Sequence, residues 1–222
     1  MGKTLLKDFK YESKDLTDKL DEASTWVGLF WEAATTFLWL VVATGAGGNS
    51  WAWALSYVVI GIAFSGSTMN SLCNVKKLLY GDMSIVHFAL NFVAHVLGAI
   101  AAYSMASQIG FAAPGVPDHG LSFGEWNWKT FFFGREFWGI FLYCLFNRKS
   151  ENESGIPASL WKLLTLAVAF QVGGANFVFV TARVFTGFAS FAAGSTWCFV
   201  LAQVWAVLLA CVVGDYVWHK YY

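Results

Sequence analysis

Two acidic residues stand inside otherwise apolar stretches of this chain, at corresponding places in its two halves. Glu32 and Glu136 each lie inside an apolar run, and the related stretches 94–99 and 202–207 follow later in each half. The matching features of the two halves are about 104 to 110 positions apart. A carboxylate at membrane depth is costly, so it is retained where it has a structural or functional partner. The repeat therefore predicts a duplicated membrane protein, which is how many transport folds are built.

The composition agrees with a membrane protein and excludes several other classes. The chain is 57% hydrophobic and only 13% charged, whereas a soluble domain carries about 25% charged residues. Its 14 basic and 14 acidic residues cancel, which argues against nucleic acid as a partner. The cysteines lack CxxC spacing, and there is no Ser/His/Asp arrangement or phosphate loop in the sequence. We therefore expect neither an enzyme nor a metal or cofactor site.

Six stretches are predicted to cross a bilayer, since about 20 mostly apolar residues span its hydrocarbon core. They are residues 26–46, 51–64, 85–105, 131–147, 160–174 and 196–217. The second and fifth are short, and each is followed by a polar break and a further short segment, 70–80 and 181–191. Interrupted segments at matching places in two halves indicate a pore or binding site. Because each half has an odd number of spans, the second half is inverted in the membrane relative to the first.

The basic residues near the spans predict the topology. They cluster on one side, so both termini are expected to be cytoplasmic, or on the equivalent inner side of an organelle membrane. The chain then divides into a charged amphipathic arm, a first repeat, a non-cytoplasmic loop and a second repeat, at 1–24, 25–110, 111–130 and 131–222. The arm is either a solvated tail or a segment that packs against the membrane or a partner.

The motifs together resemble the aquaporin, or major intrinsic protein, family over about residues 26–218. Glu32 and Glu136 match the family's carboxylates in its first and fourth spans, and 65–70 resembles its SGxxxN entry to the first half-helix. The resemblance implies an all-α membrane protein with six transmembrane helices and two re-entrant half-helices, arranged as an inverted 3+3 repeat. It also implies a homotetramer.

Both of the family's Asn-Pro-Ala boxes are altered in this chain. The residues at the two predicted pore constrictions are Asn70, Ser71 and Leu72, and Val180, Thr181 and Ala182. By the resemblance, the N-termini of two half-helices meet there and repel cations while neutral molecules pass in single file. Asn70 can still cap its helix and donate, whereas Val180 has no side-chain donor or acceptor. Thr181 is an alternative cap.

Two residues match selectivity-filter positions of the family. Arg183 is expected to donate hydrogen bonds and exclude cations at the outer mouth, or else to be a snorkelling interface residue. Phe177 either narrows the pore or packs elsewhere. The filter residues of the second and fifth spans are not assigned, and the candidates lie in 51–55 and 166–170.

The buried polar residues are expected to hold the fold together. By the resemblance, Glu32 and Glu136 accept hydrogen bonds from backbone N–H groups of the re-entrant segments, which suits the need of non-helical backbone at membrane depth for protein partners; a proton relay is the alternative. His95 and Gln203 occupy matched positions of the repeat and should bond across helices, with a pH gate as the alternative for His95. Small residues such as Gly61 and Gly98 should permit close helix crossings.

Two functions from different classes remain. The first is an integral, multi-pass membrane channel for water or small uncharged solutes such as glycerol. The second is a non-conducting, aquaporin-like structural subunit of a larger membrane assembly, which the altered second box favours. Both functions imply contact with the lipid bilayer. The channel would also meet water or small neutral solutes and identical subunits, whereas the structural subunit would contact neighbouring subunits of a complex. A proton-coupled transporter that uses Glu32 or Glu136 is a weaker alternative.

Overall fold

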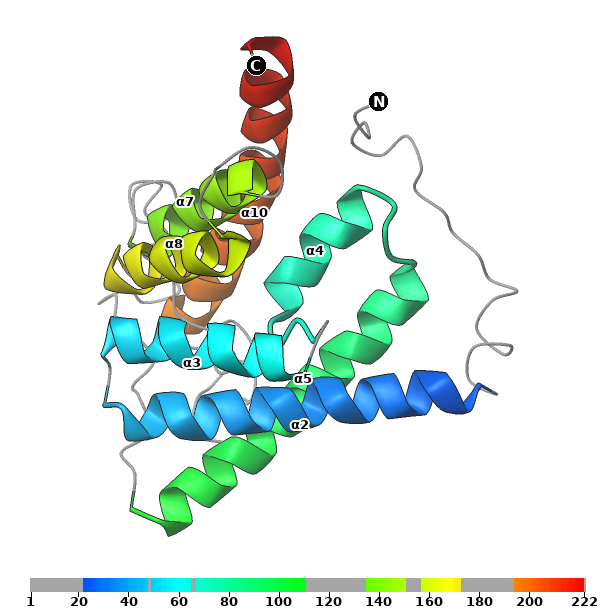
Figure 1. Ribbon diagram of the computed structural model, residues 1–222, viewed down its shortest axis with the longest axis vertical. Helices are drawn as coiled ribbons and strands as arrows, with labels where there is room; N and C mark the ends of the chain where they lie inside the picture. Colours follow the sequence, from blue (N-terminus) through cyan, green and yellow to red (C-terminus); the bar gives the residue numbers. More distant parts are fainter. Residues whose placement is uncertain are drawn as a thin grey trace.

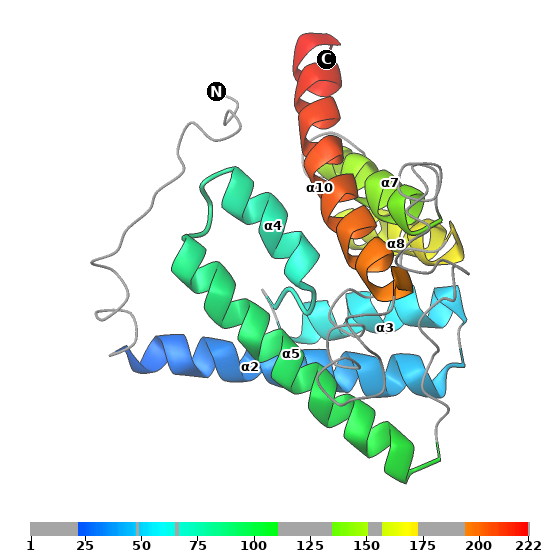
Figure 2. The same cartoon turned by 180° about the vertical axis from the view of Figure 1, so that it is seen from behind.

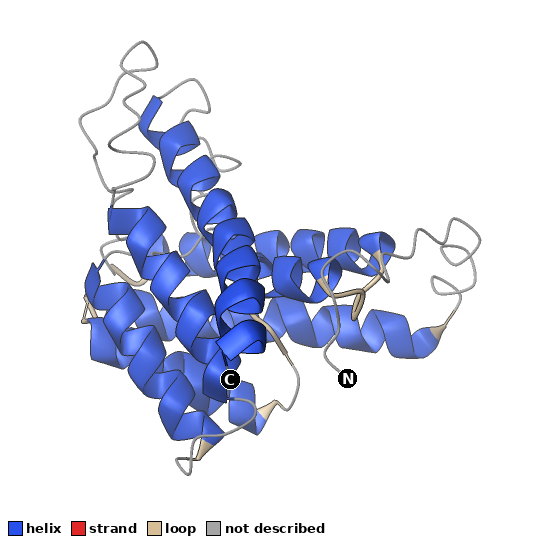
Figure 3. Ribbon diagram, turned by 90° about the horizontal axis from the view of Figure 1, so that it is seen from above, coloured by secondary structure: helices blue, strands red, loops and turns tan. Residues whose placement is uncertain are grey.

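The computed structural model describes residues 22–47, 49–64, 67–110, 135–150, 157–172 and 194–221, and every secondary-structure element in these ranges is an α-helix (Figure 3). The helices are α2 (Ala23–Gly45), α3 (Ser50–Ala63), α4 (Ser71–Leu79), α5 (Ile85–Gln108), α7 (Arg135–Ser150), α8 (Ala158–Val172) and α10 (Gly194–Tyr221) (Figure 1). The prediction of an all-helical chain is confirmed for these residues.

The six predicted spans lie mainly within α2, α3, α5, α7, α8 and α10, and the predicted short segment 70–80 corresponds to α4. Two of these helices are long and apolar enough to cross a membrane by themselves, namely α2 with 23 residues and the 22 residues 85–106 of α5. The other apolar stretches in the described ranges have 10–17 residues. Membrane crossing by those shorter helices stays a prediction.

Polar side chains define where three of the helices begin. Asn49 accepts hydrogen bonds from the backbone N–H groups of Trp51 and Ala52 at the start of α3. Asn70 and Ser84 cap α4 and α5 in the same manner. The first N–H groups of a helix have no partner within it, so a side-chain acceptor at this position stabilises the helix by about 1 kcal/mol.

The helices pack in two similar sets. In the first half α2 packs against both α3 and α5, and in the second half α7 packs against both α8 and α10. Figure 2 shows the crossing of α5 over α2 most clearly. The halves are joined where α3 packs against α8 and α4 against α10. Exchanging α2 with α7, α3 with α8 and α5 with α10 converts the packing pairs of one half into those of the other.

The apolar side chains lie both inside and outside this helical body. One buried cluster joins the two halves and includes Trp39, Tyr57 and Leu166. Large apolar side chains also cover the outer faces of α2, α3 and α5, where Phe30 is 63% exposed and Ile62 is 62% exposed. Extensive exposed apolar surface indicates contact with a membrane or another protein, which agrees with the membrane character of α2 and α5.

The crossing of α2 and α5 depends on a glycine. A Cβ atom added at Gly98 would lie 2.2 Å from the carbonyl oxygen of Ala33 and 3.1 Å from the Cβ of Thr36. The prediction that Gly98 permits a close crossing is therefore confirmed. At Gly61 the nearest atom to an added Cβ would be the Cε of Met69 at 3.4 Å, which is an ordinary contact.

Candidate functional site

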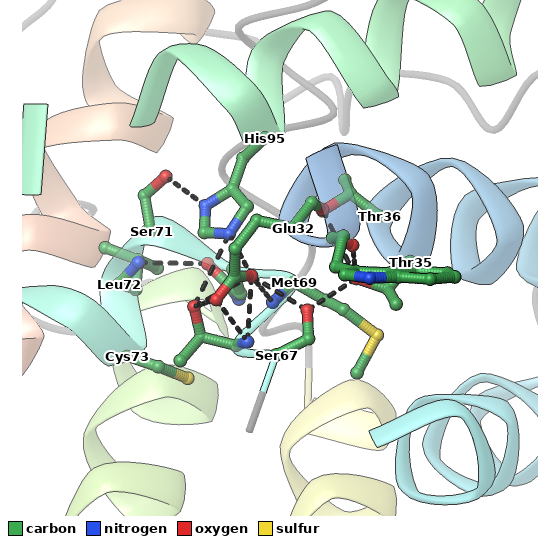
Figure 4. Close-up of polar contacts among 12 residues, drawn as sticks. Glu32, Thr35, Thr36, Ser67, Met69, Ser71, Leu72, Cys73 and His95 are labelled. Carbon is green, nitrogen blue, oxygen red and sulfur yellow. Dashed lines mark hydrogen bonds and ion pairs between the residues drawn. The ribbon is translucent and has the colours of Figure 1, made fainter. Parts of the chain in front are cut away.

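The Glu32 carboxylate on α2 holds the non-helical segment 67–69 in place (Figure 4). Its Oε2 atom accepts hydrogen bonds from the backbone N–H groups of Thr68 at 2.9 Å and Met69 at 3.2 Å. The hydroxyl of Ser67 donates to the same oxygen at 2.8 Å. Buried backbone N–H groups outside a helix need acceptors, and one carboxylate provides them here. These are the contacts expected of Glu32 from the sequence.

This segment carries backbone strain directly before α4. Met69 is fully buried and has a φ of 49°, in the left-handed region that non-glycine residues rarely adopt. That conformation costs on the order of 1 kcal/mol. Because Glu32 binds the N–H of Met69 itself, it stabilises the residue that turns the chain into the Asn70 cap. Glu32 thereby determines where α4 begins.

His95 on α5 completes the contacts of this site. Its Nε2 atom lies 2.9 Å from Oε2 of Glu32, and its Nδ1 atom lies 3.0 Å from Oγ of Ser71. The ring is fully buried. A neutral imidazole protonated at Nε2 satisfies both contacts, because Nε2–H donates to the carboxylate and Nδ1 accepts from the Ser71 hydroxyl. His95 thus links α2, α5 and the first residue of α4.

The fold therefore creates a serine–histidine–carboxylate chain that the sequence analysis did not find. Ser71, His95 and Glu32 are separated by 24 and 63 positions, so no local motif reveals them. The order of groups is that of hydrolytic triads. However, Ser71 is only 2% exposed and lines neither of the two cavities described next. In the described structure these three groups connect α2 and α5 to the start of α4.

Two cavities beside this site share part of their walls. The larger has a volume of about 640 Å³ and extends to Ser67 and Thr68. The smaller has a volume of about 10 Å³ and is lined by Asn70 and by residues of α7 and α8. Both are lined by Tyr57, Cys73 and Tyr143, which we call the collar. A volume of about 10–15 Å³ admits about one water molecule, so the smaller cavity has room for about one water molecule.

The collar side chains are held by one another and by the non-helical segment 67–69. The Tyr57 hydroxyl donates to the carbonyl oxygen of Thr68. The Cys73 sulfur lies 3.6 Å from the Tyr57 oxygen and 3.9 Å from that of Tyr143. Since these residues come from α3, α4 and α7, no sequence signal brings them together. They were not among the residues predicted for the site.

Aromatic rings enclose the narrow cavity on the side of α8. Phe170 lines it, with its ring centroid 5.7 Å from that of Trp53 and 6.3 Å from that of Trp39. Trp39 in turn packs edge-on against Tyr57 with the ring centroids 4.9 Å apart. Phe170 and Trp53 belong to the two ranges that the sequence left open for the filter. The structure places Phe170 at the cavity and Trp53 in the buried core.

The remaining predicted residues are only partly described. Asn70 caps α4, accepting from the Leu72 N–H at 3.0 Å, and lines the narrow cavity, while Leu72 lines the larger one. Gln203 is fully buried on α10. The other site residues predicted in the second half lie outside the described residues; they are Phe177, Val180, Thr181, Ala182 and Arg183. Glu136 lies in α7, but its side chain is outside the described part of the structure. Their roles stay predictions.

Comparison of the chain with protein-family models and with curated proteins found no match. Within the described ranges, no three His, Cys, Asp or Glu side chains are grouped so as to hold a metal ion. What the arrangement does place together is a carboxylate-anchored segment, a short helix capped by an asparagine, and two cavities that share the collar residues.

Proposed function

We propose that this protein is an aquaporin-like channel that passes water or small uncharged solutes through a membrane. The observation that carries the proposal is the Glu32 carboxylate, which anchors the non-helical residues 67–69 directly before the nine-residue helix α4. Nine residues give a helix of about 14 Å, less than half of a hydrocarbon core of about 30 Å. A helix of this length, beginning at a buried strained turn, suits a re-entrant half-helix.

The packing of the helices supports the proposed architecture. The pairs formed by α2, α3 and α5 recur among α7, α8 and α10, as expected of six transmembrane helices in an inverted 3+3 repeat. We place the second half-helix in 181–191, opposite α4, and both termini on the cytoplasmic side. By the family resemblance, the assembly is a homotetramer.

The start of α4 has the chemistry that such a channel needs. The helix N-terminus carries a partial positive charge, which repels cations and leaves neutral molecules free to pass. The Asn70 oxygen accepts from the Leu72 N–H, so its amide NH2 group remains able to donate at the narrow cavity. We assign the matching constriction to Val180, Thr181 and Ala182. Arg183 and Phe177 are the proposed filter.

The size of the narrow cavity favours water as the solute. About 10 Å³ beside Asn70 and Phe170 accommodates roughly one water molecule, whereas a glycerol-sized molecule needs several times that volume. The indole N–H of Trp53, which packs against Phe170, is buried without an acceptor in the described structure. A buried donor of this kind is commonly satisfied by water.

The same narrowness supports the second candidate function. Phe170, Trp39 and Trp53 pack closely beside the cavity, and such a wall suits a non-conducting structural subunit of a larger membrane assembly. In that protein the Glu32 contacts would stabilise the helices without serving a path. The neighbouring subunits would then cover part of the exposed apolar surface.

Water permeability separates these functions. The purified protein is reconstituted into liposomes, and shrinkage in a hyperosmotic buffer is followed by stopped-flow light scattering. A water channel shrinks the vesicles faster than empty liposomes, and Phe170→Ala, which widens the narrow cavity, accelerates shrinkage further. Val168→Ala is the matched control, since Val168 is 47% exposed on the same helix and lines neither cavity.

Cys73 tests whether solute passes the collar. A mercurial reagent bound to its sulfur adds bulk to the wall that the two cavities share, so it should slow shrinkage in the wild type and leave Cys73→Ser unaffected. Shrinkage equal to that of empty liposomes in both the wild type and Phe170→Ala would remove the channel and leave the structural subunit.

A further inference from the structure

Lysines from both halves of the chain converge on the larger cavity. Lys76 and Lys77 on α4 line it together with Lys162 on α8, and Asp82 is the one acidic residue among the lining residues that the structure describes. With His87 neutral, three lysines against one aspartate leave two formal positive charges. The volume of about 640 Å³ is that of a small-molecule site, since such sites measure about 300–1,000 Å³.

The position of Lys162 is not explained by its own helix. Lys76 and Lys77 lie in the last turn of α4, where positive charge complements the helix dipole. Lys162 instead lies near the start of the apolar helix α8, and its Nζ atom is 5.0 Å from the centroid of the Tyr57 ring. Tyr57 is only 1% exposed, so this ammonium group reaches inward instead of extending into water. It lies directly at the collar.

One hydroxyl donor and a helix N-terminus lie at the wall of the same cavity. Ser84 lines the cavity and caps α5 by accepting from the His87 N–H at 3.2 Å, which leaves its own hydroxyl hydrogen free to donate. The N-terminal end of α5 adds a partial positive charge at this wall. Ser67 and Thr68 donate their hydroxyl hydrogens to Glu32, and Tyr57 donates its own to the Thr68 carbonyl oxygen, so these hydroxyl groups of the lining are already engaged.

We propose that this cavity, which we call the basic vestibule, binds a small phosphate-bearing anion. Lys162 and the lysines of α4 attract the phosphate oxygens, and the Ser84 hydroxyl donates to one of them. The phosphate belongs either to a soluble compound or to a phospholipid headgroup. The site does not depend on conduction, because it needs only the vestibule and its charges. In a conducting protein an anion held there covers the collar and slows permeation.

Binding of pyrophosphate tests the soluble source. The full chain is placed in nanodiscs of phosphatidylcholine, and pyrophosphate is titrated by isothermal calorimetry. Removing one charged donor should weaken binding about tenfold, so Lys162→Gln lowers the affinity and Lys162→Arg retains most of it. Asp82→Asn acts in the opposite sense and strengthens binding, because it removes the one acidic group of the described lining.

Nanodiscs that contain a phosphatidylinositol phosphate, without soluble phosphate, test the headgroup source. The thermal midpoint should rise in the wild type and rise less in Lys162→Gln. A response in one arm identifies the source of the phosphate. Folding of each variant is verified by its circular dichroism spectrum, and Lys77→Gln replaces Lys162→Gln if that variant does not fold. Absence of binding in both arms, or equal binding by wild type and the lysine variants, overturns the proposal whether or not the protein conducts.

Discussion

Replacing Gly98 by alanine tests the packing on which the whole site depends. The new Cβ would lie 2.2 Å from the Ala33 carbonyl oxygen and 3.0 Å from the Ala33 carbonyl carbon. A carbon and an oxygen that are not bonded to each other usually lie about 3.3–3.6 Å apart, as in weak C–H···O contacts, which is roughly 1 Å more than this distance. Neither of the two Ala33 backbone atoms can rotate away. Helices α2 and α5 must therefore separate by about 1 Å.

The expected loss of stability can be worked out from this geometry. Overpacking of this kind costs about 1–3 kcal/mol, and the better helix propensity of alanine returns up to about 1 kcal/mol. The separation also stretches the 2.9 Å contact between Glu32 and His95, since these residues lie on the same two helices. We expect a net loss of about 1–3 kcal/mol. For a chain of this size that lowers the melting temperature by roughly 2–4 °C per kcal/mol.

Two other glycines provide matched controls. Gly61→Ala meets only the flexible end of Met69 at 3.4 Å, and Gly28→Ala meets nothing within 4 Å. Thermal unfolding is followed by circular dichroism in detergent micelles for the wild type and the three variants. Gly28→Ala and Gly61→Ala should melt at or above the wild-type temperature, and Gly98→Ala clearly below it. Equal melting of Gly98→Ala and Gly61→Ala would refute the close crossing.

Three further substitutions probe the site itself. His95→Ala removes one of the donors to a buried carboxylate and should cost about 1.5–3 kcal/mol, measured by melting, whereas His95→Gln keeps a donor for Glu32 and should recover much of the loss; equal melting of the two variants would contradict the hydrogen-bonded role. Glu32→Gln places amide hydrogens against the N–H groups of Thr68 and Met69 and should increase protease cleavage at 67–69, so unchanged cleavage would count against the anchor. Asn70→Ala removes a helix cap, worth about 1 kcal/mol, and should also reduce water permeability, unlike the equivalent cap variant Asn49→Ala; equal permeability of the two would argue against a pore role for Asn70.

The helices were predictable because their signals are local. Long apolar runs identify α2 and α5, and Asn70 was expected to cap the helix that follows it, as it does in α4. The contact between Glu32 and the segment before Asn70 was also anticipated, because an intramembrane carboxylate and an interrupted apolar segment each require a partner. Local sequence patterns were sufficient to predict the helices, and the carboxylate of Glu32, which needs hydrogen-bond donors, was sufficient to predict the contact.

The collar and the histidine contacts were not predictable in the same manner. Cys73 and Tyr143 are 70 positions apart, and their proximity depends on how α4 and α7 pack. His95 was expected to bond across helices, but its second contact with Ser71 depends on where α4 begins to within one residue. Such a register is decided by the strained backbone at Met69, which no sequence period reveals.

The anchoring by Glu32 has a consequence for how the protein is made. The first donors to this carboxylate follow it by 35 positions, and His95 follows by 63. During synthesis the ribosome therefore delivers α2 well before anything can neutralise its acid. We expect the nascent helix to wait at the translocon or the bilayer surface, since an unpartnered carboxylate resists entry into lipid. Stable insertion of α2 then awaits α5.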